Sequence, residues 1–153
     1  MVTCEPSKLL LTVRVRLPAL HNIRRGVIRM VNVFVDDLRK CPDNYLLFRT
    51  AEEFIEYLTN NPETKINVLS LDHDLGLEVM DGYELVKNIY YQFPELHIQE
   101  VRLHTDNGIG FRNMYHYFVS AMDNNALPNV KYVSPYVYDV IDGNINKGFK
   151  MIK

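Results

Sequence analysis

Short runs of β-branched and apolar residues alternate along the chain with stretches of helical spacing, and this alternation limits the folds that the chain can form. Strands separated by helices favour βαβ units with right-handed crossovers, so we expect an α/β domain with a mostly parallel sheet of about five strands. Helices are expected from 50 to 60, over 82–93 and over 111–122. The expected strands cover residues 31–36, 45–49, 66–71, 98–104 and 129–133, and an edge strand could follow at 136–141.

Local signals agree with this alternation. Thr50, with Glu53 three residues later, is a capping-box pattern at the start of the first helix. From Phe111 to Met122, apolar residues recur at i, i+3, i+4, i+7, i+8 and i+11, which indicates an amphipathic helix. Segment 38–44 contains a proline and two turn-forming residues and is expected to be a loop.

Charge divides the chain near Met30. The 153 residues have a formal net charge of -2, but residues 1–29 carry +5 and residues 30–153 carry -7. The strand pattern also begins at Met30, so we expect 1–29 to be a flexible or non-native N-terminal extension and 30–153 to be the domain. An alternative is that 1–29 is a basic arm that binds nucleic acid. The acidic domain itself does not favour an extended nucleic-acid surface, because phosphate binding needs basic charge.

The composition also bears on membranes and redox state. No apolar run approaches the roughly 20 residues that a membrane span requires, and the early run 9–11 soon meets Arg14 and Arg16. We therefore expect a cytoplasmic protein with no membrane partner. The two cysteines, Cys4 and Cys41, show neither a CxxC motif nor zinc-finger spacing, and they are expected to be free thiols.

Polar clusters follow three of the predicted strands. In an open parallel sheet, ligands bind at the carboxyl ends of the strands, so these clusters are expected to meet at one rim. The four carboxylates of Asp36, Asp37, Asp72 and Asp74 would then lie close together and need a cation to neutralise them, and their hard oxygen ligands suit Mg²⁺ or Mn²⁺. The clusters are Asp36-Asp37, Asp72-His73-Asp74 and His104-Thr105-Asp106-Asn107.

A glycine-containing turn adds a second feature to the same rim. The segment Asn107-Gly108-Ile109-Gly110 is expected to precede the amphipathic helix, and its glycines would let backbone N–H groups approach an anion. Arg112 and Asn113 are expected in the first turn of that helix, where they would clamp a phosphate. A metal ion and a helix terminus would then hold the phosphate from two sides.

The order of these features resembles the receiver domain of two-component response regulators. Asp36-Asp37 is similar to the metal-binding acidic pair of receivers, segment 74–85 to their phosphoacceptor segment, and Thr105 to their switch residue. Two departures stand out. Ser134-Pro135 occupies the place of the receiver Lys-Pro, and the loop 38–44 occupies the place of a full helix.

A receiver-derived branch, the cyclic-phosphate processing receiver-like domain, resembles the chain more closely over about residues 30–135. This resemblance implies a three-layer receiver-like (flavodoxin-like) fold. It also implies a nucleotide ligand and a role in processing cyclic phosphates on nucleotides, in phage or bacterial nucleotide metabolism or in RNA repair. The elements that carry it are 35–42, 70–76, 81–86, 104–107 and Asn113-Met114.

The first functional hypothesis is a metal-dependent phosphoesterase. Asp36, Asp37 and Asp72 would hold the divalent cation. Either His104 protonates the leaving oxygen or His73 activates a water molecule, and either Asp72 or Asp74 could attack as a nucleophile; these alternatives stay open. The residues expected to bind or orient the substrate phosphate are Arg39, Thr105, Asn107, Arg112 and Asn113.

The second hypothesis is a non-catalytic receiver-like module that takes a phosphate or binds a nucleotide without turnover. The receiver-like spacing from Asp74 to Gly82 favours it. Ser134 in place of lysine, together with His73 and His104, argues against it. A third reading is an interaction protein that has kept the fold and lost the chemistry.

Overall fold

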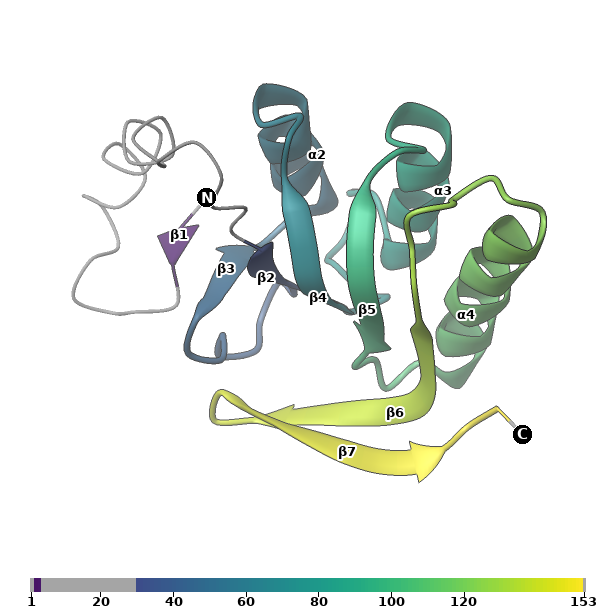
Figure 1. Ribbon diagram of the computed structural model, residues 1–153. Coiled ribbons are helices and arrows are strands. Elements are labelled where there is room, and N and C mark those ends of the chain that lie inside the picture. Colours follow the sequence, from purple (N-terminus) through teal and green to yellow (C-terminus); the bar gives the residue numbers. More distant parts are fainter. Residues whose placement is uncertain (1, 4–29, 153) are drawn as a thin grey trace.

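The computed structural model describes residues 2–3 and 30–152, and from Met30 onward strands and helices alternate along the chain (Figure 1). The helices are α2 (Ala51–Asn60), α3 (Gly82–Gln92) and α4 (Gly108–Asp123). The strands are β1 (Val2–Thr3), β2 (Met30–Val35), β3 (Tyr45–Phe48), β4 (Lys65–Leu71), β5 (His97–Leu103), β6 (Val133–Ile141) and β7 (Asn144–Lys150).

The strands form a sheet in the order β1-β3-β2-β4-β5-β6-β7. The central strands β3, β2, β4, β5 and β6 are parallel, whereas β1 and β7 pair antiparallel at the two ends of this set. In chain order the parallel strands therefore follow the 2-1-3-4-5 arrangement of flavodoxin-like folds. This confirms the predicted α/β class with a mostly parallel sheet.

The three helices cover one face of the sheet (Figure 1). Their buried side chains join the inward-facing residues of β2, β4 and β5 in a single apolar cluster. The predicted periodicity over 111–122 is the buried stripe of α4, where Phe111, Met114 and Phe118 are fully buried. Burial of such side chains supplies the main driving force that fixes the helices against the strands.

On the opposite face, the β6–β7 hairpin crosses near the carboxyl ends of β4 and β5 and covers that part of the sheet (Figure 1). Val140 of the hairpin packs against a small cluster made of Phe34, Cys41 and Leu47. At the hairpin turn, a Cβ on Gly143 would lie 3.3 Å from the carbonyl oxygen of Cys41. In the described residues the third layer is therefore a strand hairpin together with the loop after β2, rather than helices.

Several predicted boundaries differ from the observed ones. Residues 129–132 run beside β5 and hydrogen bond to it, but regular strand begins only at Val133. The predicted edge strand 136–141 is the second half of β6 and pairs with β7, which the sequence pattern did not predict. Thr50 caps α2 by accepting from the N–H of Glu53, while the Glu53 carboxylate accepts from Arg49 rather than completing the capping box.

The start of α4 also differs from the prediction. The helix begins at Gly108, and Asn107 is its N-cap, with its side chain accepting from the N–H of Gly110 at 2.8 Å. This cap satisfies one of the free N–H groups of the first turn, which offsets the poor helix propensity of the two glycines. Arg112 and Asn113 therefore lie in the second turn, and the prediction of a first-turn position is wrong.

Cys41 is disulfide-bonded in the structure, so the prediction of a free thiol at this position is wrong; Cys4 lies outside the described residues. The proposed extension 1–29 also lies outside them, apart from β1, which pairs with β3.

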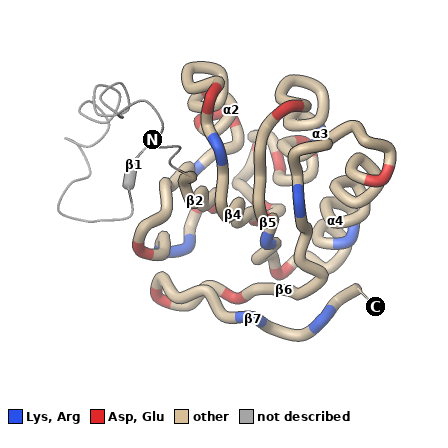
Figure 2. Tube along the Cα trace, in the orientation of Figure 1, with Lys and Arg blue, Asp and Glu red and all other residues tan. Residues whose placement is uncertain are grey.

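Among the described helices, none is long and apolar enough to cross a membrane. Figure 2 shows basic and acidic positions interspersed over the described elements.

A glycine at the start of α3 lets the segment after β4 lie close to that helix. The N–H of Gly82 donates to the carbonyl oxygen of His73 at 2.7 Å, and a Cβ on Gly82 would lie 2.2 Å from the carbonyl oxygen of Asp72. We expect Gly82→Ala to destabilise the protein by roughly 1–3 kcal/mol in urea unfolding, because backbone must shift to relieve the overlap.

Gly108→Ala is the matched control, because Gly108 also occupies the first position of a helix. Its Cβ would meet only the Met151 side chain, at an ordinary 3.8 Å. We expect no loss of stability, or a gain of up to about 1 kcal/mol from helix propensity. Equal destabilisation by the two substitutions would contradict the close-approach explanation.

Candidate functional site

The site lies where three parallel strands end side by side. Val35, Leu71 and Leu103 occupy the same level of β2, β4 and β5. The hydrogen-bond ladder continues one step further, since the N–H of Asp72 donates to the Val35 carbonyl and the N–H of His104 donates to the Leu71 carbonyl. The register therefore brings the polar residues that follow these strands to one edge, as the sequence predicted.

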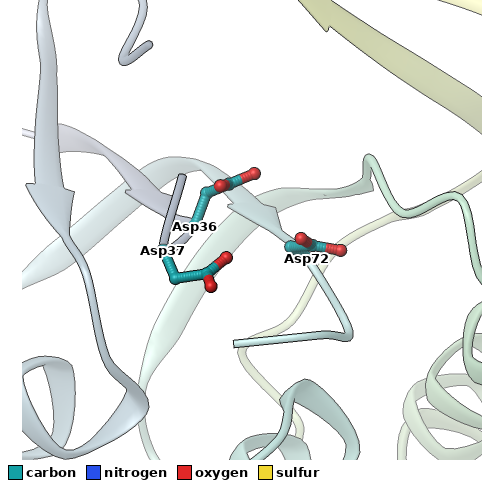
Figure 3. A group of neighbouring side chains, drawn as sticks. All are labelled: Asp36, Asp37 and Asp72. Carbon is teal, nitrogen blue, oxygen red and sulfur yellow. The ribbon is translucent and has the colours of Figure 1, made fainter. Parts of the chain in front are cut away.

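Three carboxylates meet at this edge. Asp36, Asp37 and Asp72 each offer one oxygen, and these oxygens lie within 4.8 Å of one another. Figure 3 shows Asp36 and Asp37 together beside Asp72, which follows the neighbouring strand β4. The fourth predicted carboxylate, Asp74, lies outside this group; its side chain is 68% exposed and pairs with His73 at 2.9 Å. We call Asp36, Asp37 and Asp72 the acidic cluster.

Arg39 reaches into the acidic cluster from the loop after β2. Its Nη1 atom donates to Oδ2 of Asp36 and to Oδ2 of Asp72, both at 2.9 Å. Its Nη2 atom donates at 2.9 Å to Asp106, whose side chain is 87% exposed. The structure thus brings Arg39, which the sequence assigned to phosphate binding, into contact with two of the three carboxylates.

Asp36 is the most heavily hydrogen-bonded member of the cluster. Its Oδ1 atom accepts from the N–H groups of Leu38 and Arg39, at 2.8 and 2.7 Å. Its Oδ2 atom accepts from Arg39 and from Nε2 of His104, the latter at 3.0 Å. These two backbone contacts fold the loop back over the strand end and thereby carry the Arg39 side chain to the cluster.

His104 is buried beneath Asp36 rather than facing the pocket. Its ring is stacked on Phe34 with centroids 4.6 Å apart, and its Nδ1 atom lies 2.7 Å from Oγ of Ser70. Because a carboxylate can only accept, Nε2 donates to Asp36, and Nδ1 is hydrogen-bonded to the Ser70 hydroxyl. Ser70, His104 and Asp36 form a buried hydrogen-bonded chain, in which His104 orients Asp36.

The pKa values of the two buried carboxylates, Asp36 and Asp72, are shifted in opposite directions. Burial would raise the pKa of Asp36, but hydrogen bonds from His104, Arg39 and Leu38 outweigh it and hold that pKa well below its usual range. Burial raises the pKa of Asp72; the imidazole of His104 opposes this shift and the negative charge of Asp36 adds to it. Asp36 is therefore the firmly ionised member, and the charge on Asp72 is held at a cost.

His73 is wedged between the N-termini of α3 and α4. Its Nδ1 atom lies 2.9 Å from the Asp74 carboxylate, and its Nε2 atom lies 3.9 Å from that of Asp81, the N-cap of α3. Gly110 of α4 makes room for the ring, because a Cβ there would lie 2.4 Å from it. The side chain of His73 is 14% exposed, whereas that of His104 is fully buried.

The other predicted phosphate-binding residues divide into two groups. Thr105 is buried and hydrogen bonds to Asp72, and Asn107 caps α4, with its side-chain nitrogen 3.4 Å from Nδ1 of His73. Both therefore lie at the rim. Arg112 and Asn113 are exposed on α4 and, among the described residues, make no hydrogen bond to the acidic cluster.

A pocket of about 690 Å³ opens beside the acidic cluster. Asp37, Arg39 and Asp72 line it, together with the exposed leucines Leu38 and Leu77. A second described pocket, of about 450 Å³, lies between α2 and α3 and includes none of the predicted site residues. The first pocket is therefore the one in which a ligand could contact the cluster.

Sequence reasoning missed two supporting residues. Arg49 donates from Nη1 to the carbonyl oxygens of Asp36 and Arg39, at 3.1 and 2.8 Å, which anchors the loop backbone. Ser70 is buried and orients His104. The sequence shows an arginine at the end of a strand and a serine inside an apolar strand. It does not show which residues these two side chains contact.

The opposite pKa shifts make a stability prediction for the metal-free protein. Asp36→Asn removes the buried anion that accepts hydrogen bonds from His104 and Arg39, and leaves Arg39 with only Asp72 and Asp106 as carboxylate partners. We therefore expect a loss of roughly 3–5 kcal/mol at pH 7 in urea unfolding with chelator present. Asp72→Asn removes a charge that the fold holds at a cost, and we expect a change within about 1 kcal/mol.

The pH dependence of the free energy of unfolding tests the same assignment. Because the pKa of Asp36 is lower in the folded state, its stabilisation is complete above the unfolded value of about 3.9 and is lost as pH falls through the folded value. The difference in unfolding free energy between the wild type and Asp36→Asn should therefore shrink only in strong acid. An equally large loss for Asp72→Asn at pH 7 would contradict the assignment.

A comparison with curated proteins gave no match. The family model for the cyclic-phosphate processing receiver domain matches residues 31–120, which run from β2 into α4 and include every residue of the acidic cluster. This match spans more than half of the chain and agrees with the strand order and with the position of the acidic residues. The chain therefore belongs to the cyclic-phosphate processing receiver domain family.

Proposed function

We propose that this protein is a metal-dependent phosphoesterase that opens cyclic phosphates carried by nucleotides. Membership of the family gives it a role related to cyclic phosphates. The observation that carries the proposal is the meeting of Asp36, Asp37 and Asp72 within 4.8 Å beside a pocket of about 690 Å³, which Asp37 and Asp72 line. Carboxylates held this closely at an accessible edge suit a divalent cation.

The donor set fits Mg²⁺ or Mn²⁺. All three candidate ligands, Asp36, Asp37 and Asp72, are carboxylates, and hard oxygen donors of this kind suit those ions. The guanidinium of Arg39 already occupies a cation position between Asp36 and Asp72, which supports the view that positive charge belongs there. When bound, the ion would polarise a phosphoryl oxygen of the substrate.

The chain's own residues would do the remaining work. In the overall reaction, water forms a new P–O bond, one ester P–O bond of the ring breaks, and the leaving oxygen takes up a proton. His73 is better placed than His104 to exchange that proton, because its side chain is 14% exposed and pairs with Asp74 and Asp81, which line the pocket. Both nitrogens of His104 are instead hydrogen-bonded in the interior. Arg39 would bind the phosphate oxygens.

The choice between Asp72 and Asp74 as a nucleophile depends on their surroundings. Asp72 is buried and bonded to Arg39, whereas the Asp74 side chain is 68% exposed. Direct hydrolysis by water needs neither residue to attack, and we favour it, with Asp72 as a metal ligand.

The cytoplasmic location, the phage or bacterial context and the nucleotide partner remain predictions.

One observation favours the non-catalytic receiver-like module. Asp74 is exposed at the edge of the sheet and keeps the receiver-like spacing to Gly82, so a phosphodonor could reach it. Incubation with a small phosphodonor and Mg²⁺ separates the two functions. Stable labelling of Asp72 or Asp74 without turnover of cyclic phosphates would favour the switch over the hydrolase.

The hydrolase proposal predicts turnover in a screen of 2′,3′-cyclic nucleotides, ADP-ribose cyclic phosphate and cyclic dinucleotides with Mg²⁺ and Mn²⁺. We expect a monoester product detectable by ³¹P NMR, and loss of turnover in excess chelator. Asp72→Asn should lower kcat/KM by more than about 100-fold, since losing a residue that only orients a metal ligand already costs about 10–100-fold.

Asp123→Asn is the matched control, because Asp123 lies at the far end of α4 from the rim. It makes the same chemical change and should leave turnover unaltered. Full activity of the wild-type protein in excess chelator, or of Asp72→Asn with Mg²⁺, would refute the metal-dependent mechanism.

A further inference from the structure

Arg39 binds two of the three carboxylates that could hold a metal ion. Its Nη1 atom lies 2.9 Å from Oδ2 of Asp36 and 2.9 Å from Oδ2 of Asp72, so one N–H-bearing atom bridges two of the candidate metal ligands. The cluster is thus neutralised in part by the chain itself. A divalent cation bound by Asp36 and Asp72 would compete with this guanidinium for their carboxylates.

The hydrogen-bond count at Asp36 sharpens this competition. Each carboxylate oxygen has two lone pairs, and Asp36 already accepts two hydrogen bonds at each oxygen. The donors at Oδ1 are backbone N–H groups, and His104 at Oδ2 is buried. Of these donors, the Arg39 side chain, which is 24% exposed, is the one able to leave.

The surroundings allow the side chain to move while the loop stays in place. Arg49 donates hydrogen bonds to the carbonyl oxygens of Asp36 and Arg39, and these bonds anchor the backbone at Arg39. The remaining contact of the guanidinium is with Asp106, which is 87% exposed, and exposed ion pairs of this kind contribute little. Arg39 also lines the pocket in which a phosphate would bind.

We propose that Arg39 is an exchangeable cation: it neutralises Asp36 and Asp72 in the metal-free protein, leaves them when a divalent ion binds, and then pairs with the substrate phosphate in the pocket. A planar guanidinium suits this transfer, because its paired N–H groups match carboxylate and phosphate oxygens alike. The inference rests on the proposed function, and it adds that metal binding and phosphate binding are coupled through this side chain.

The first test is calorimetric titration with Mn²⁺ alone. Arg39→Gln removes the competing cation, so we expect it to bind Mn²⁺ about tenfold more tightly than the wild type, in proportion to the charge-assisted hydrogen bonds that no longer have to break. With Mn²⁺ bound, the same variant should bind inorganic phosphate at least about tenfold more weakly. A merely structural role would weaken both equilibria together.

Lys131→Gln is the matched control, since it removes the same charge from an exposed residue beside the beginning of β5, whereas the acidic cluster lies beyond the ends of β2 and β4. It should change neither affinity by more than about twofold. Unchanged or weaker Mn²⁺ binding by Arg39→Gln would overturn the exchange.

The second test follows the side chain itself by ¹⁵N NMR during Mg²⁺ titration. In the metal-free protein, Nη1 and Nη2 are held by different carboxylates, so separate, slowly rotating Nη resonances are expected for Arg39, identified by their loss in Arg39→Gln. Saturating Mg²⁺ should merge them. Separate resonances at saturation would overturn the exchange while leaving the metal site intact, whereas absence of any Mg²⁺ or Mn²⁺ binding would overturn the proposed function as well.

Discussion

Two buried carboxylates at neighbouring strand ends, Asp36 and Asp72, share one guanidinium group, and the arrangement of the site depends on that contact. Burying two like charges side by side is costly unless positive charge lies between them. The chain supplies it locally, because Oδ1 of Asp36 accepts from the backbone of Leu38 and Arg39 and so folds the loop over the edge of the sheet. Asp36, which needs a neighbouring cation, therefore also positions the Arg39 side chain that supplies it.

The β6–β7 hairpin contributes to the site from the face opposite the helices. Val140 packs on the cluster that contains Phe34, and Phe34 in turn stacks on the ring of His104. Water is thereby kept from the hydrogen bonds that join Ser70, His104 and Asp36, and such bonds are stronger in a dry environment. The hairpin thus maintains the orientation of Asp36 even though it carries none of the cluster residues.

The edge of the sheet was predictable because apolar runs that stop at an acidic residue mark strand ends, and parallel strands share a carboxyl edge. The partners of Arg39 were not predictable, because periodicity carries no information about a side chain in a loop. Asp74 was placed too close because the chain turns away from the edge after Asp72. The hairpin was missed for a similar reason: β7 is mostly exposed and polar, so it lacks the alternation that reveals a strand.

The position of the positive charge distinguishes this chain from the receivers that it resembles. Where receivers carry lysine after the last core strand, Ser134 is buried and lies 3.1 Å from the Tyr138 hydroxyl, so this position offers no cation. The charge comes instead from Arg39, three residues after a candidate metal ligand. A cation on a separate strand could bind phosphate independently of the metal. A cation on the same loop as Asp36 would compete with a metal ion for its carboxylate, so the proposed exchange would link occupation of the acidic cluster to the binding of phosphate.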